Sequence, residues 1–497
     1  MKKIVVILVL VLSPFAMGLF AQCDSNDFKG VVIAFDHSLE KLPTICTDAD
    51  PNPPTPFDTS EWRRIYFIHG LGGNNKAWAS TARACWDNSL GIDGFPARKC
   101  VTSRPNYSTH TYSAAEAADY VRGEISSTAL DDKTRGIVPS RSIIIAHSQG
   151  GIVSRTLMHL DMVQQYGHPT FTDGKMNYGG VVMVSSPLQG AAILKNRQMI
   201  INWANNGCSN LVLGPENNLA YKVPIIKDWI KKVLNNVSDK VCNVATDNLL
   251  PMFFKTYFEG ITEDYNTATP HGVAYINMLN QDTLNKRYRD LPKIVFYGIE
   301  PENNLLWRTL NWMYYDPNGD NGANGPNPAP FEANDDWLLY KNTIKPMIDD
   351  YRAKTQSHLA EYNRLYAKKQ KFFVGWFVSA NKIIDEKNSW IAWDAGNSWF
   401  NNAPHQWQEI LGAKVINGNS FTYKQSDGVV LTESSSNLPG ATRPPVPIYP
   451  NKDKTVDIDK GSSHMQIRND AGLKEHLNKL LNGDYGWWFR TPEQPKF

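Results

Sequence analysis

The chain has 497 residues, of which 42% are hydrophobic and 20% are charged, and its formal net charge is +2. This composition is typical of a globular protein with a sizeable core, and the near-neutral charge argues against nucleic-acid binding driven by bulk charge. The length suits two or three average domains, or one large α/β domain with insertions.

The N-terminus has the layout of a bacterial-type export signal. Residues 1–3 are Met-Lys-Lys, residues 4–20 are mostly apolar, and Ala21 offers a small residue at a cleavage point. We therefore expect residues 1–22 to be a signal peptide and the mature protein to be periplasmic or secreted. An uncleaved membrane anchor is the alternative, since the stretch barely reaches spanning length. A lipoprotein site at Cys23 would require a small residue before it, and glutamine stands there.

Export would place the cysteines in an oxidising compartment, where disulfides form. All six follow the predicted signal, and no Cys-x-x-Cys occurs, which leaves little support for a zinc or redox site. Other pairings stay open, but we favour sequence neighbours: Cys23 with Cys46, Cys85 with Cys100, and Cys208 with Cys242.

Residues 141–155 organise the rest of the chain. Three isoleucines at 143–145 predict a buried strand, and helically spaced apolar residues come afterwards. Ser148 stands at the turn between them, with Ala146 and Gly150 two places to either side, as a nucleophile elbow requires. We predict that Ser148 is a nucleophile. The alternative is an ordinary strand-to-helix turn with this serine as the helix N-cap.

A glycine-rich loop lies about eighty residues earlier. Residues 65–68 predict a short buried strand, which runs directly into His-Gly-Leu-Gly-Gly at 69–73. Glycines let the backbone approach a ligand closely, and lipase-like enzymes use such a loop to point an N–H at a carbonyl oxygen. Taken alone, it could also be a plain loop at a strand end.

Further elements alternate along the chain. A short strand is predicted within 99–107, a helix over 113–127, and a buried strand from 179 that breaks into Ser-Ser-Pro-Leu-Gln-Gly at 185–190. Strands that alternate with helices predict a mostly parallel sheet with helices on both faces, an α/β fold.

These three segments, at 69–73, 146–151 and 185–190, resemble the α/β-hydrolase superfamily. Within it they are similar to bacterial serine lipases and esterases, including the group similar to GPI-inositol deacylases. The third segment usually reads Thr-Pro-His-x-Gly, from which Ser186 and Leu188 depart. The resemblance covers roughly residues 60–200, and it resumes at 291–300 and from 426 to the C-terminus.

The resemblance implies an α/β-hydrolase core with a large, mainly helical lid or insert. The expected division is: signal peptide 1–22, N-terminal extension 23–60, first core part 61–300 with a helical cap at 191–290, Trp-rich helical insert or lid 301–420, and second core part 421–497.

A serine hydroxyl needs a base within hydrogen-bond reach and a group that orients that base. In this superfamily they follow in the order serine, acid, histidine. Asp427, in Ser-Asp-Gly-Val-Val, resembles the catalytic-acid loop of lipases, and His464 resembles their histidine loop. We assign Asp427 as the orienting acid and His464 as the general base and acid, with the backbone N–H groups of Leu71 and Gln149 as the oxyanion hole.

Other candidates remain beside this assignment. Glu300 and Glu302 follow a predicted late strand and are alternative acids. His147 adjoins the nucleophile and is either structural or in contact with substrate. His69, with Gly70, is expected to support the oxyanion loop. His476 lies in a helical pattern and is expected on a helix face.

Within the insert, a helical pattern runs from Asp336 to about Ile384, and tryptophans follow at 376, 390, 393, 399 and 407. They form either a lid or substrate-binding surface, or the small core of a helical hairpin. Asp316, Asn318 and Asp320 have the spacing of the first calcium-loop ligands, but the glycine and the final glutamate of that loop are missing.

The predicted function is an exported serine hydrolase that cleaves carboxylic esters. The expected partners are an ester or lipid-like substrate and, in a transient contact, a membrane or lipid interface, and no nucleic-acid partner is expected. No metal or organic cofactor is required, apart from the weak calcium alternative. The same triad would also serve an acyltransferase, thioesterase or amidase, and a non-catalytic binding protein on this fold is a third alternative.

Overall fold

The computed structural model describes most of the chain from Trp62 to Glu493. The described residues are 62–86, 96–109, 111–163, 171–172, 175–208, 260–284, 291–300, 305–315, 340–371, 375–441, 444–448, 463–465, 467–469 and 471–493. The predicted signal peptide, the N-terminal extension and the candidate calcium ligands at 316, 318 and 320 lie outside them.

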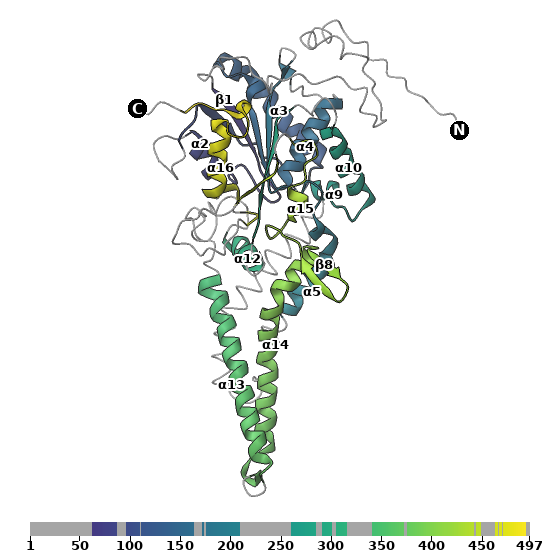
Figure 1. Ribbon diagram of the computed structural model, residues 1–497, viewed down its shortest axis with the longest axis vertical. Coiled ribbons are helices and arrows are strands. Elements are labelled where there is room, and N and C mark those ends of the chain that lie inside the picture. Colours follow the sequence, from purple (N-terminus) through teal and green to yellow (C-terminus); the bar gives the residue numbers. More distant parts are fainter. Residues whose placement is uncertain are drawn as a thin grey trace, which may run out of the picture.

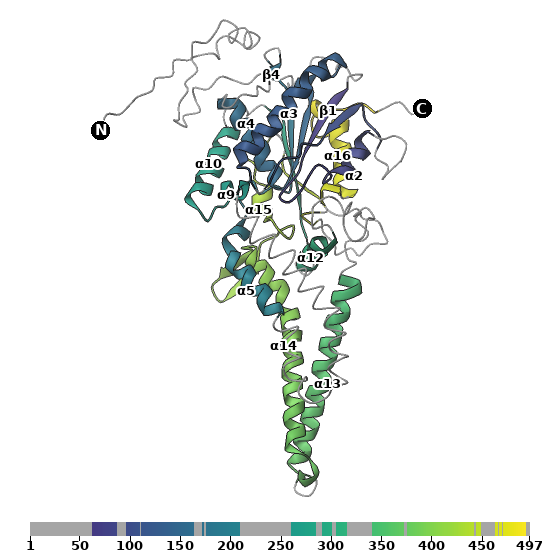
Figure 2. The same ribbon diagram turned by 180° about the vertical axis from the view of Figure 1, so that it is seen from behind.

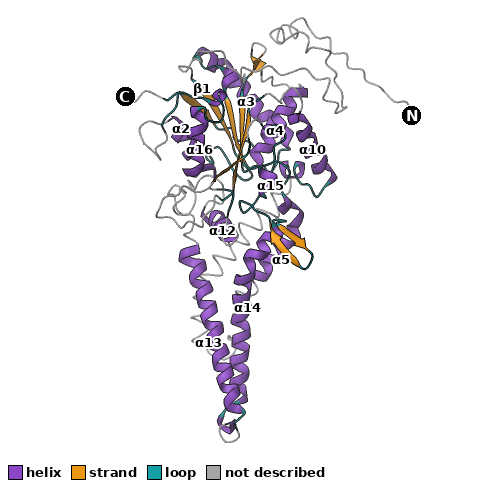
Figure 3. Ribbon diagram, in the orientation of Figure 1, coloured by secondary structure: helices purple, strands orange, loops and turns teal. Residues whose placement is uncertain are grey.

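A six-stranded sheet forms the core of the body from which the helical hairpin extends (Figures 1 and 3). Each neighbouring pair in it is parallel. From edge to edge the strands are β10 (Val446–Ile448), β7 (Lys293–Gly298), β6 (Gly180–Val184), β3 (Ile143–His147), β1 (Arg63–Ile68) and β2 (Cys100–Ser103). The long apolar runs at 143–146 and 181–184 suit central parallel strands, which are buried on both faces.

Successive side chains of a strand point to opposite faces, and this alternation divides the core. Ile143 and Ile145 belong to one buried cluster, with α2 (Ala79–Trp86) and α16 (Ala471–Asn482) over it. Ile144 and Ala146 belong to the other cluster, which helices α3 (Ala114–Thr134) and α4 (Gln149–Val163) cover. The sheet is therefore sandwiched between two helical layers, as the sequence predicted.

The helices over the second face begin where the sequence places their starts. Helix α3 (Ala114–Thr134) has Ser113 as its N-cap, and a capping box joins Ser113 and Glu116 reciprocally. Helix α4 (Gln149–Val163) starts directly after Ser148, and α10 (Pro270–Leu284) packs beside it.

Shorter elements connect or extend these layers. They are η4 (Pro139–Arg141), β4 (Phe171–Thr172), β5 (Lys175–Met176), η5 (Ala192–Asn196), α5 (Arg197–Cys208), α9 (Ile261–Asp264), α12 (Leu305–Tyr315), β8 (Lys414–Asn417), β9 (Ser420–Tyr423), α15 (Thr432–Ser435), η11 (Ile467–Asn469) and η12 (Trp487–Phe489).

Two long helices extend away from the sheet as a hairpin (Figures 1 and 2). A π-helical turn, η9 (Tyr340–Ile344), leads into α13 (Lys345–Lys369), and α14 (Ala380–Ile410) returns to the body. The prediction of one helical pattern up to Ile384 was wrong at 370–371 and 375–379, since α13 ends at Lys369 and a 3-10 turn, η10 (Gly375–Phe377), precedes α14. A Cβ on Gly375 would lie 2.3 Å from the Lys369 carbonyl oxygen, so the reversal needs glycine there.

Aromatic side chains form a core where the hairpin meets the body. Trp393, Trp399 and Trp407 of α14 are all buried. Trp203 of α5 lies 5.7 Å from Trp399 and 5.6 Å from Trp407 between ring centroids. These tryptophans therefore fit the hairpin-core interpretation, and Trp376, which is 85% exposed, does not.

Residues on either side of the insert build one sheet, since β10 pairs with β7 and α16 covers the same face as α2. Among the described residues, no helix combines the length and hydropathy that crossing a membrane requires.

The predicted disulfide between Cys85 and Cys100 is not present. Both are buried free thiols, and the Cys100 thiol donates to the Cys85 carbonyl oxygen at 3.4 Å. Burial raises the pKa of Cys85 to about 12 and that of Cys100 well above its usual value, so both thiols stay protonated. Cys23, Cys46, Cys242 and the Cys208 side chain lie outside the described residues.

Candidate active site

Ser148 occupies a strained turn between β3 and α4. Its φ is 54°, a left-handed conformation that non-glycine residues rarely adopt, and its amide donates to the Val184 carbonyl oxygen at 3.0 Å. Close packing of the α4 N-terminus on the sheet stabilises this turn. A Cβ on Gly150 would lie 2.5 Å from the His69 carbonyl oxygen, so glycine is required. The turn thus has the backbone geometry of a nucleophile elbow.

Three side chains from distant parts of the chain form one hydrogen-bonded series. The Nε2 atom of His464 lies 2.8 Å from Ser148 Oγ, and its Nδ1 lies 2.7 Å from Asp427 Oδ2. Ser148 is 8% exposed, His464 3% and Asp427 0%. With the ring proton on Nδ1, the imidazole donates to the carboxylate and accepts from the hydroxyl, which is the arrangement that a general base requires.

The backbone around Asp427 fixes its carboxylate. Oδ1 accepts hydrogen bonds from the amides of Val429 at 3.1 Å and Val430 at 2.8 Å, so Oδ2 is left to face the imidazole. The His464 amide donates to the Asp427 carbonyl oxygen at 2.8 Å, which joins the two loops directly. Gly428, with φ 97°, makes the turn possible.

The glycine-rich loop lies directly against the serine. A Cβ on Gly70 would lie only 2.6 Å from the Ser148 Cβ. His69 is buried, its Nδ1 lies 3.0 Å from the Gly70 carbonyl oxygen, and its ring stacks on Tyr107 with centroids 4.2 Å apart. Burial lowers the pKa of His69 to about 4, so it is neutral at physiological pH. Its contacts are those of a residue that supports the loop.

The side chain of His147, the residue before Ser148, contacts the backbone of His464. Its Nε2 lies 2.7 Å from the His464 carbonyl oxygen, and the side chain is fully buried. Burial, followed by the nearby His464, lowers the pKa of His147 well below its usual value, so this ring is also neutral. Of the two roles that the sequence left open, the structural one fits these contacts.

Gln149 is the first residue of α4, so its amide N–H has no acceptor within the helix. Leu71 follows Gly70 on the facing loop and is partly exposed. Both amides thus stand on the two segments that meet at Ser148. Their role as oxyanion donors stays a prediction.

Glu300 and His476 have other side-chain partners. Glu300 is buried in an ion pair with Arg308, at 2.7 Å between Oε2 and Nη1, and it is Asp427 that contacts the imidazole. Glu302 lies outside the described residues. His476 is a half-buried residue of α16 whose Nδ1 lies 2.5 Å from the Tyr485 hydroxyl. In the described part of the chain, no group of His, Cys, Asp and Glu side chains could hold a metal ion.

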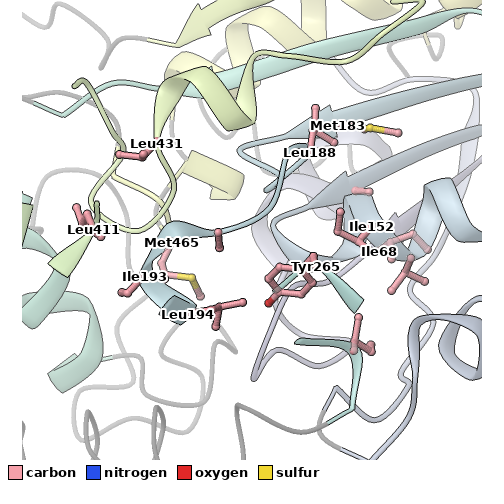
Figure 4. Close-up of a cluster of buried hydrophobic side chains, with 14 of the residues drawn as sticks. Ile68, Ile152, Met183, Leu188, Ile193, Leu194, Tyr265, Leu411, Leu431 and Met465 are labelled. Atoms are coloured by element: carbon pink, nitrogen blue, oxygen red, sulfur yellow. The ribbon is translucent and has the colours of Figure 1, made fainter. Parts of the chain in front are cut away.

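Apolar residues anchor the loops of the site in the larger core cluster (Figure 4). Met465, next to His464, is buried in the same cluster as Ile193 and Leu194 after β6, and Leu431 follows the Asp427 loop into it. The histidine loop, the Asp427 loop and the segment after β6 therefore pack on the same apolar cluster.

Sequence reasoning missed residues that hold the site from outside its motifs. Trp407 of α14 donates from Nε1 to the Gly428 carbonyl oxygen at 3.0 Å. The Tyr107 hydroxyl donates to the His69 carbonyl oxygen. Both contacts join segments far apart in the chain, so no local pattern could have revealed them.

The parallel sheet, the serine elbow after β3 and the later acid and histidine loops together form an α/β-hydrolase fold with a helical insert, which confirms the predicted fold class.

The chain is structurally similar to bacterial lipases and esterases. The mature lipase BlEst2 of Bacillus licheniformis is 12% identical, with 49% of this chain and 68% of that chain covered and a TM-score of 0.26. Phospholipase PlaB of Legionella pneumophila is 14% identical over 52% of this chain and 42% of that chain, with a TM-score of 0.29. EstA of Clostridium botulinum is 17% identical over 52% and 66%, with a TM-score of 0.25.

No protein-family model matches the chain, and no curated protein sequence matches it either. The structural similarities are remote, so the functional argument rests on the geometry of the site.

Proposed function

We propose that this protein is an exported serine hydrolase of carboxylic esters, of the lipase or esterase type, related to the GPI-inositol deacylase-like group. The observation that carries the proposal is the hydrogen-bonded series of Ser148, His464 and Asp427, with the serine at a strained φ of 54°. The apolar N-terminal segment with its Met-Lys-Lys start supports export to the periplasm or the medium.

In the proposed mechanism, His464 takes the proton of Ser148 as its oxygen attacks the ester carbonyl. The fully buried Asp427 stabilises the imidazolium that forms, because a negative charge 2.7 Å away favours the charged ring. The amides of Gln149 and Leu71 stabilise the developing oxyanion, an effect on the order of several kcal/mol. His464 then protonates the leaving alcohol, and a water molecule releases the acyl group through the same base.

The fixed elbow makes this arrangement efficient. Because the backbone holds Ser148 within 2.8 Å of the base, little conformational entropy is lost when the reaction begins. The neutral, buried His69 and His147 support the two loops without adding charge beside the imidazole.

The test compares the purified protein with Ser148→Ala on short-chain and long-chain p-nitrophenyl esters. We expect the variant to lose activity by about a thousandfold or more. Ser154→Ala, six residues further along in α4, is a matched control, because its hydroxyl donates to the Gly150 carbonyl oxygen and does not contact His464. Equal rates for Ser148→Ala and the unaltered protein would refute the proposal, and the chain-length ratio would separate esterase from lipase.

A further inference from the structure

We propose that the tip of the helical hairpin docks on an anionic phospholipid surface. The tip comprises Lys368 at the end of α13, Lys371 just after it, Trp376 and Phe377 in η10, and Lys382 at the start of α14. It lies at the far end of the hairpin from the sheet (Figures 1 and 2). The 25 residues of α13 alone extend over about 37 Å at the usual helical rise.

The two aromatic side chains at the tip are almost fully exposed. Trp376 is 85% exposed and Phe377 is 90% exposed, whereas Trp393, Trp399 and Trp407 of the same hairpin are buried at its base. Leaving two such side chains in water is unfavourable, because burying each of them would remove a large apolar surface from contact with water. Neither contributes to the hairpin core, so the folding of this chain does not account for their presence.

The backbone holds these aromatics in a defined position. Gly375 donates to the Lys371 carbonyl oxygen at 2.7 Å, and the Val378 amide donates back to Gly375 at 3.3 Å. The Lys369 ammonium group donates to the Val378 carbonyl oxygen at 3.0 Å, which closes the turn. Trp376 and Phe377 therefore project from a hydrogen-bonded 3-10 turn, Gly375–Phe377, and little backbone entropy is lost when they are buried.

The positive charge around the tip favours an anionic partner. Residues 362–384 contain five Lys or Arg residues and no Asp or Glu, although the whole chain has a net charge of only +2. Lys368, Lys371 and Lys382 are all exposed. Tryptophan favours the membrane–water interface, and lysines beside it are attracted to anionic headgroups.

The narrow tip suits a lipid surface better than a protein. A stable protein interface buries about 800 Å² on each partner, which exceeds what the end of two helices, each about 10 Å wide, can offer. Insertion of a few aromatic side chains into a bilayer interface needs no such area. The tip lies at the far end of the hairpin from the sheet, and Ser148 stands between strand β3 of that sheet and α4 (Figures 1 and 2). Docking would therefore tether the catalytic domain without covering the serine.

The experiment is co-sedimentation of the purified protein with vesicles of phosphatidylcholine alone or mixed with phosphatidylglycerol. We expect binding to the mixed vesicles, weakened by salt, and a loss of about tenfold or more in Trp376→Ala/Phe377→Ala. Lys368→Gln/Lys371→Gln should lose about tenfold on the anionic vesicles. Ile416→Ala/Phe421→Ala, which removes exposed apolar side chains from β8 and β9, is the matched control and should bind normally.

Thermal unfolding and hydrolysis of a short soluble ester should be the same in all variants, so a failure of the proposed catalysis stays distinct from a failure of docking. Absence of binding by the unaltered protein, or equal binding by the tip variant, would overturn the proposal. A dimer in the absence of lipid that Trp376→Ala/Phe377→Ala dissociates would also overturn it, in favour of a second copy of the chain as the partner.

Discussion

The indole nitrogen of Trp407 donates a 3.0 Å hydrogen bond to the carbonyl oxygen of Gly428, the residue after Asp427. Trp407 is fully buried near the end of α14, and Gly428 stands in the turn that aims the carboxylate at His464. This hydrogen bond joins the hairpin helix directly to the acid loop. The insert is therefore part of the site's support as well as an extension from it.

Trp407→Phe should weaken both the fold and the site. The variant keeps most of the apolar volume but leaves the Gly428 carbonyl with only the 3.4 Å contact from the Thr309 hydroxyl, so we expect a loss of about 1–2 kcal/mol in the free energy of unfolding. A severalfold fall in kcat should accompany it, because the acid loop loosens.

Denaturant unfolding and ester hydrolysis measure these two effects. Trp399→Phe is the matched control, since its indole nitrogen has no hydrogen-bond partner among the described residues. Equal kcat values for the two variants would contradict the role assigned to the Trp407 hydrogen bond.

Asp427→Asn and Glu300→Gln should separate the two candidate acids. The first replaces the acceptor of the imidazole Nδ1–H by an amide that favours the wrong tautomer, so kcat should fall by about a thousandfold to ten-thousandfold while the fold persists. The second leaves the buried Arg308 guanidinium without its carboxylate, so it should cost about 3 kcal/mol of stability.

Rates must be compared per folded molecule, with the folded fraction taken from circular dichroism. If Glu300→Gln lowered kcat as far as Asp427→Asn does, Glu300 would have to be reconsidered as a functional acid.

Gly70→Ala should disturb the nucleophile specifically. The added methyl group would meet the Ser148 Cβ at 2.6 Å, so either the loop or the elbow must move, and a 1 Å displacement of reacting groups costs about a hundredfold in rate. Gly136→Ala is a useful comparison, because its φ of 75° disfavours alanine but no atom lies within 4 Å of the new Cβ. It should lose about 1 kcal/mol of stability and no activity.

The stability of the fold should decrease in acid because of His69. Its folded pKa of about 4 lies below the ordinary value of 6.5, so between these pH values the unfolded chain binds a proton that the folded chain does not. Its contribution is therefore fully present above pH 6.5 and is lost as the pH falls toward 4, by about 3 kcal/mol. His147, whose pKa burial also lowers well below its usual value, acts in the same direction.

Urea unfolding at a series of pH values would measure this slope. His69→Asn should flatten it, whereas His405→Asn, at an exposed position of α14, should leave it unchanged. An unaltered slope in His69→Asn would show that other groups cause the acid sensitivity.

The sequence by itself determined the elements whose signals are local. The isoleucine run before Ser148 and the small residues around it specify the strand and the elbow, because steric limits decide them locally. The helix predicted from residue 113 begins there as expected, but it continues past the predicted end at residue 127 to Thr134. The resemblance to lipases also pointed to Asp427 and His464, and the structure brings both to Ser148.

Only the tertiary structure decided what depends on contacts between distant segments. Helical periodicity could not tell that the chain reverses at Gly375, nor that Trp393 is buried while Trp376 is exposed, because both belong to similar local patterns. Likewise, the spacing of Cys85 and Cys100 did not reveal that both stay free thiols. The residues around Gly428 also gave no sign that its carbonyl oxygen accepts a hydrogen bond from Trp407. Burial and hydrogen-bond partners are set by which surfaces meet on folding, and that information is spread over the whole chain.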